Sequence, residues 1–161
     1  PLIHRAVHVL SGTRVALFLD TPLAAAITAF LLELGCEVPL VCLTDAPTAS
    51  EEAFLAACTR LGAEFEQPAP AVFNPERPRV LAGASRNQQY MAFVEECGRD
   101  FIPLVIGSSH QKAQLKRSDV RVIEMGFPSV GKHWMYPVPW MGYNGAVALV
   151  QRLVDALMRS W

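Results

Sequence analysis

The chain has 161 residues, of which 52% are hydrophobic and 18% are charged. That length supports one domain with its own hydrophobic core, and the composition excludes an intrinsically disordered chain. Fourteen Lys and Arg residues against fifteen Asp and Glu residues leave a net charge of −1, which argues against a nucleic-acid partner. The longest apolar stretch, residues 23–32, is half of the about 20 residues that a membrane span needs, so we expect no membrane insertion.

The first part of the chain predicts a βαβ unit. Residues 14–20 form an apolar run that ends in a carboxylate, which is typical of a strand buried on both faces. A Thr21 N-cap before Pro22 predicts the start of a helix, and Gly35 its end. Residues 38–43 predict a second buried strand, which must run parallel to the first across a right-handed crossover.

The rest of the chain repeats this alternation. Helices are expected at about 50–61, 85–97, 110–117 and 146–158, and strands at 79–82, 102–106 and 120–125. Repeated strand and helix with short joints predicts an α/β fold: a doubly wound, mostly parallel sheet flanked by helices. Four prolines within residues 67–78 predict a stiff surface loop. The parts on either side are too small to be separate domains, so residues 1–161 are expected to form a single one.

Polar residues follow two of the predicted strands. Ligands of open parallel sheets bind at the carboxyl ends of the strands, where helices begin. Asp20 and Thr21 come there after the first strand, and Ser108, Ser109 and His110 come there after the strand at 102–106. We expect all five to line a cofactor or substrate cavity. Helix capping is the alternative role for the Ser108–His110 turn.

A long aromatic loop supplies the other candidates. Five of the fourteen aromatic residues fall between Phe127 and Tyr143. Such a loop must pack against a partner chain, a flat ligand or its own domain. The cavity-lining candidates in it are His133, Trp134, Trp140 and Met141.

The four cysteines predict no metal site. Cys36, Cys42, Cys58 and Cys97 form no C-x-x-C pair and have no paired histidine, so we expect free thiols in a reducing cytoplasm. No catalytic or metal-ligating residue is assigned. The N-terminus shows no signal peptide and no start Met, so we expect either removal of Met before Pro1 or excision from a longer protein.

Several segments carry a family resemblance. They are residues 12–22 (GTRVALFLDTP), 30–37 (FLLELGCE), 104–110 (LVIGSSH), 125–128 (MGFP) and 140–146 (WMGYNGA). In this order they resemble the last large Rossmann-like domain of nitrogenase component 1 proteins, from about Gly12 to near the end of the chain. That family comprises the nitrogenase α and β subunits, their cofactor-assembly scaffold homologues, and the light-independent protochlorophyllide and chlorophyllide reductases.

The resemblance implies partners and cofactors. Members assemble as paired homologous subunits, and an ATP-dependent iron-sulfur reductase protein delivers electrons to them. In the nitrogenase α subunit, a histidine before the Gly-Tyr/Phe-x-Gly motif ligates the iron-molybdenum cofactor, whereas Met141 stands there in this chain. None of the four cysteines matches the family's cluster motifs. The resemblance therefore implies no cofactor in this domain, and an iron-sulfur cluster or metallocluster in the full complex.

The Gly-Phe-Pro run and the Gly-x-Ser-His turn resemble β-type or scaffold-type subunits most. Residues 130–135 depart from the Asp-Arg that commonly follows Phe-Pro in β-type members. Three hypotheses follow. The first is a domain, inert alone, that walls a cavity and docks on a homologous component 1 subunit. The second is a chlorophyllide or protochlorophyllide reductase domain whose aromatic loop flanks a tetrapyrrole, and the third is a free-standing Rossmann-like module that binds a small anion.

Overall fold

The chain folds around one parallel β-sheet. The computed structural model describes residue 6 and residues 8–45, 50–63, 78–126, 128–129 and 142–158. The strands are β1 (Arg14–Leu19), β2 (Glu37–Leu43), β3 (Arg79–Leu81), β4 (Leu104–Gly107) and β5 (Arg121–Glu124), and the helices are α2 (Thr21–Glu33), α3 (Glu51–Arg60), α4 (Arg86–Arg99), α5 (Ser109–Gln114) and α6 (Gly142–Met158). The five strands pair in the order β3-β2-β1-β4-β5, all parallel. This confirms the predicted doubly wound α/β fold class.

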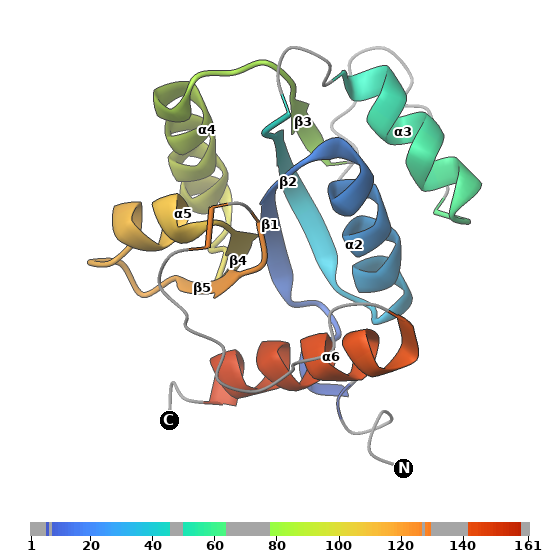
Figure 1. Cartoon of the computed structure of the whole chain (residues 1–161). Coiled ribbons are helices and arrows are strands. Elements are labelled where there is room, and N and C mark those ends of the chain that lie inside the picture. Colours follow the sequence, from blue (N-terminus) through green and yellow to red (C-terminus); the bar gives the residue numbers. More distant parts are fainter. Residues whose placement is uncertain are drawn as a thin grey trace.

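Helices cover both faces of the sheet (Figure 1). Alternate residues of β1 point to opposite faces, as strand geometry requires. Leu17 and Leu19 pack with α2, α3 and α6 in one core, whereas Ala16 and Phe18 lie in the other core with residues of α4 and with Leu115, which directly follows α5. Because both faces are covered, the central strands read as continuous apolar runs, at residues 15–19 in β1 and 104–107 in β4, rather than as alternating ones. None of the described helices is long and apolar enough to cross a membrane.

The helix boundaries differ slightly from those predicted. Asp20, not Thr21, occupies the N-cap of α2, and Pro22 lies in the first turn as expected. Thr21 is instead the first helical residue, and its hydroxyl donates to Asp45 Oδ1 at 2.9 Å. The helix expected at 110–117 is shorter, because α5 ends at Gln114 and turns follow it. Residues 67–77 of the proline-rich segment lie outside the described residues.

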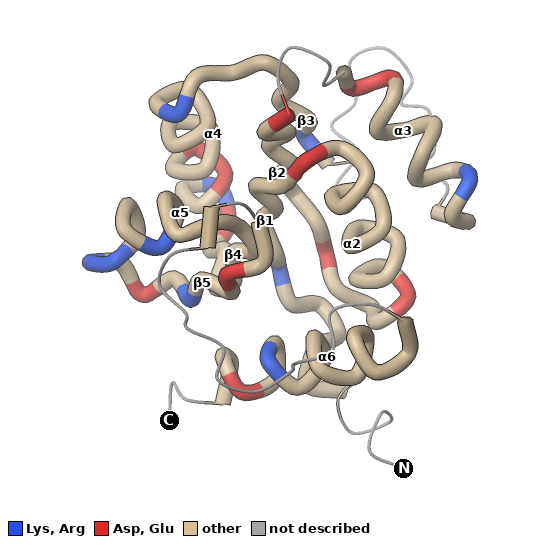
Figure 2. Tube along the Cα trace, in the orientation of Figure 1, with Lys and Arg blue, Asp and Glu red and all other residues tan. Residues whose placement is uncertain are grey.

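Ion pairs connect the amino ends of β1 and β3 to neighbouring elements. Arg14 at the start of β1 lies 3.6 Å from carboxylate oxygens of both Glu37 and Asp100, and its side chain also donates to the Asp100 carbonyl. Arg79 at the start of β3 pairs with Glu95 at 2.8 Å. Figure 2 shows how these charges are distributed along the fold. The opposite, carboxyl edge carries most of the predicted site.

Candidate functional site

The candidate site lies where the strand order reverses, at the carboxyl ends of β1 and β4. The chain leaves β1 into α2 on one face of the sheet and leaves β4 into α5 on the other face (Figure 1). Divergent connections of this kind mark the ligand position of open α/β sheets. The register pairs Leu17 with Ile106, so Asp20 and Ser108 both come just past the last paired residues. We call this place, with Asp20, Thr21, Ser108 and Ser109, the switch edge.

The β1 side of the switch edge presents acceptors. The Asp20 side chain makes no capping hydrogen bond to the start of α2, although Asp20 holds the N-cap position. Its carboxylate therefore lies beside the positive end of a 13-residue helix but accepts no hydrogen bond from the N–H groups of the first turn. The Thr21–Asp45 hydrogen bond links this side to the residues that follow β2.

On the β4 side, Ser108 is a structural cap. Its hydroxyl donates to Gln111 Oε1 at 2.7 Å and accepts from the His110 N–H at 3.2 Å. The Ser108 N–H also donates to Gln111 Oε1, at 2.9 Å. Both side chains are buried, with 5% of Ser108 and 7% of Gln111 exposed. Capping, the alternative left open for this turn, is thus the role that the geometry gives to the Ser108 hydroxyl.

The segment after β5 is held against the switch edge. The N–H groups of Met125 and Gly126 both donate to the Gly107 carbonyl, at 2.8 and 3.0 Å, and the Ser109 N–H donates to the Pro128 carbonyl at 2.9 Å. A Cβ on Gly126 would lie 3.1 Å from Leu19 Cδ2 and 3.3 Å from the Phe18 carbonyl oxygen. The aromatic loop therefore begins in direct contact with the ends of β1 and β4.

Two further contacts near this edge involve residues that sequence reasoning missed. Arg86 Nη2, from the first turn of α4, lies 3.3 Å from His110 Nε2. Lys112 Nζ lies 3.1 Å from Glu124 Oε1, and Glu124 is only 1% exposed. This distance makes an ion pair, yet neither Glu124 oxygen accepts a hydrogen bond with good geometry. No local sequence signal links either pair, because the fold alone brings α4 to α5 and α5 to the end of β5.

The remaining candidates belong to the aromatic loop. His133, Trp134, Trp140 and Met141 lie outside the described residues. The structure thus brings together Asp20, Thr21, Ser108 and Ser109 at one edge, with His110 on the exposed side of the same turn.

The described cysteines are poor ligands for a cluster. All four are free thiols, and three of them are buried. Burial raises the pKa of Cys36 and Cys58 to about 11 and that of Cys42 to about 12, so these groups stay protonated at neutral pH. Among the described residues, no three His, Cys, Asp or Glu side chains gather as a metal site would require. The described side chains therefore do not fit a resident metallocluster.

Comparison with known proteins gives the family. The model of the family described as Nitrogenase component 1 type Oxidoreductase matches residues 2–158. The nitrogenase molybdenum-iron protein beta chain of Frankia alni is 30% identical over 158 residues, which are 96% of this chain and 26% of that protein. The beta chain of Azotobacter vinelandii is 28% identical over 159 residues, or 92% of this chain and 27% of that protein.

A solved structure shows the same fold. The structure of nitrogenase Cp1 at pH 6.5 matches with a TM-score of 0.71 and 21% identity, over 99% of this chain and 31% of that one. The chain thus spans about a quarter of the length of the curated beta chains that it resembles. By its sequence match over nearly all its residues, the chain belongs to the nitrogenase component 1 type oxidoreductase family and is beta-chain-like.

Proposed function

We propose that this chain serves as a Rossmann-like domain of a component 1 type oxidoreductase subunit, where it walls a cofactor or substrate cavity and docks on a homologous subunit. Electrons would come from an ATP-dependent iron-sulfur reductase protein, and the cluster would be held by other parts of the complex. The isolated chain would then be inert.

One observation carries the cavity-wall role: three separate connections converge on the switch edge. The start of α2 brings the unused Asp20 carboxylate there, and the start of α5 brings the Ser109–His110 turn. The Ser109–Pro128 hydrogen bond holds the start of the aromatic loop at the same place. Polar groups from three connections at a switch point are what a ligand-lining surface of an α/β domain needs.

The cavity role is tested in the complex with a homologous component 1 subunit. Asp20→Ala and His110→Ala should lower reductant-driven product formation, or shift the spectrum of the bound cofactor, while the chain still co-purifies with its partner. Glu52→Ala, at an exposed position in the first turn of α3, is the matched control and should change neither. Unchanged activity and spectra in both site variants would refute the cavity role.

The inert character of the chain is tested separately. Anaerobically purified 161-residue chain should show no iron-sulfur absorbance and no turnover with the reductase protein. Stoichiometric iron in the isolated chain would contradict the proposal, because the chain would then hold a metal centre of its own.

A further inference from the structure

A buried carboxylate ends β5, at a position where an apolar residue would continue the core. Val122 and Glu124 are two residues apart in the strand, so they point to the same face of the sheet, and Val122 packs in the core on the α4 side. Glu124 is only 1% exposed, and neither of its oxygens accepts a hydrogen bond with good geometry. A buried charge in this state is costly, so its presence needs an explanation.

Lys112 supplies a positive charge that faces Glu124. Helix α5 packs against β5, and Lys112 Nζ lies 3.1 Å from Glu124 Oε1. The two partners differ in burial, since half of the Lys112 side chain is exposed whereas Glu124 is enclosed. An ammonium carries three N–H groups, and the carboxylate lies on one side of it. The ion pair therefore holds the ammonium in place and leaves its exposed side open to a ligand.

The pair lies at the switch edge. In the sheet register Glu124 pairs with Gly107, the residue directly before Ser108. Lys112 reaches this place from α5, the helix that follows β4. The segment after Glu124 is fixed at the same place, because the Gly126 N–H donates to the Gly107 carbonyl at 3.0 Å. The Lys112 ammonium thus lies at the same edge as the groups proposed to line the cavity.

The stability of the fold does not account for this pair. Removing a carboxylate from water costs hydration free energy, and an ion pair with a half-exposed partner regains only part of it. Well-packed apolar residues in place of a buried ion pair are often equally or more stable. An apolar side chain at position 124 would continue the core that Val122 joins. What the pair adds is a cation held at a fixed place on the switch edge.

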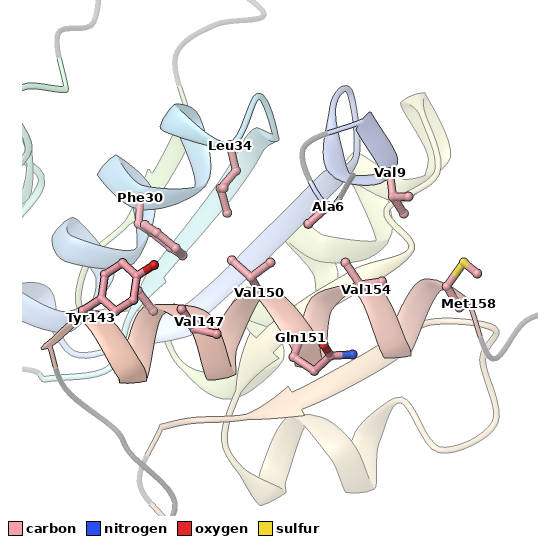
Figure 3. A pocket seen from close by; sticks show the side chains of 11 residues that line it. Ala6, Val9, Phe30, Leu34, Tyr143, Val147, Val150, Gln151, Val154 and Met158 are labelled. Carbon is pink, nitrogen blue, oxygen red and sulfur yellow. The ribbon is translucent and has the colours of Figure 1, made fainter. Parts of the chain in front are cut away.

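The apolar groove of the domain lacks such a cation. It has a volume of about 550 Å³ and lies along α6, on the opposite face of the sheet from α5. Figure 3 shows Phe30 and Leu34 of α2 pointing toward α6 there. Its lining residues include no charged side chain, and only Gln151 and the Tyr143 hydroxyl supply polar side-chain atoms. Of these two places, only the switch edge offers an anionic ligand a counter-charge.

We propose that Lys112 binds an anionic group of the ligand in the cavity, and that Glu124 is the positioning residue that holds its ammonium. This role rests on the proposed cavity-wall function and adds the chemistry of the ligand. The group would be a carboxylate or a phosphate, to which an ammonium donates charge-assisted hydrogen bonds. It would lie on the α5 side of the switch edge, away from the Asp20 carboxylate at the start of α2.

The test is a titration of the 161-residue chain with inorganic phosphate and, separately, with malonate, at constant ionic strength. The amide NMR signals of residues 107–112 should shift and saturate at millimolar concentrations of at least one of the two anions. Saturation by phosphate alone would identify a phosphate group, and saturation by malonate alone a carboxylate. No saturable shift with either anion overturns the proposal.

Variants separate the cation from its support. The double variant Lys112→Met and Glu124→Gln removes both charges without leaving a buried carboxylate unpaired, and should weaken anion binding about tenfold or more. Lys112→Arg keeps the cation and should bind within about threefold of the wild type. Lys116→Met, at an exposed position in the turn after α5, is the matched control and should bind like the wild type. Wild-type affinity in the double variant overturns the proposal.

Glu124→Asp tests the positioning role. It keeps the charge of the site and withdraws the carboxylate by one methylene, so a weaker anion affinity would come from the displaced ammonium alone. Unchanged affinity would refute the role of Glu124. These titrations need no partner subunit, so they can fail while the activity tests on Asp20 and His110 support the cavity, and those tests can fail while anion binding at Lys112 stands.

Discussion

Replacing Gly126 by Ala tests whether the segment after β5 packs on the ends of β1 and β4. Gly126 does not have a positive φ, so alanine fits the backbone there. The added Cβ, however, would lie 3.1 Å from Leu19 Cδ2 and 3.3 Å from the Phe18 carbonyl oxygen. Leu19 is fully buried and the carbonyl belongs to a paired strand, so neither neighbour moves easily. Overpacking of this kind costs about 1–3 kcal/mol.

A smaller gain opposes that cost. Gly→Ala restricts the unfolded chain and stabilises by about 0.4–1 kcal/mol where the native backbone allows it. The net loss for Gly126→Ala is therefore about 1–2 kcal/mol, which lowers the Tm of a chain of this length by roughly 2–8 °C.

Gly98→Ala is the matched control. Gly98 lies in α4, has no positive φ, and a Cβ there would meet nothing within 4 Å. Helix propensity alone then predicts a gain of up to about 1 kcal/mol and a Tm higher by roughly 2–4 °C. Thermal unfolding followed by circular dichroism measures both variants. If Gly126→Ala matched or exceeded the wild-type Tm, the close packing of this segment on the switch edge would be wrong.

Three other measurements address the residues around the site and the core. In urea titrations, Ser108→Ala should lower the free energy of unfolding by about 1–2 kcal/mol, because it removes a buried cap. Ser85→Ala removes an exposed cap and should lower it by about 0.5–1 kcal/mol. Equal losses would contradict the burial of the Ser108 cap. Lys112→Met should destabilise more than Glu124→Gln, because it strands a buried carboxylate, whereas Gln removes the charge and leaves a half-exposed lysine to hydrate. The opposite ranking in the same titrations would show that the ion pair does not satisfy Glu124. The free energy of unfolding should also fall as pH rises above about 9. The thiols of the unfolded chain ionise there, whereas the buried thiols of the folded chain keep their protons because burial raises their pKa to about 11 or 12. Cys42→Ala should make this decline less steep, and an unchanged slope would contradict the attribution to thiols.

The sequence alone was sufficient for the fold class and for the elements near the switch edge. Short apolar runs such as residues 15–19 and 104–107 are typical of strands buried on both faces, as in a sheet covered by two layers of helices. The Gly35 stop and Pro22 start act through local backbone geometry, so they can be read without any tertiary contact. The family resemblance followed from motifs in the right order, and the family match confirms it.

Only the tertiary structure decided what the individual polar groups do. The Thr21 hydroxyl, predicted to cap α2, instead donates to Asp45, 24 residues away, and Asp20 holds the N-cap position. The Arg86–His110 and Lys112–Glu124 contacts join residues whose distance in space depends on the crossover of helices between strands. Periodicity reports which positions of α6 are apolar, whereas the packing of α6 on the sheet determines that Leu149 and Leu153 are buried while Val147 stays exposed.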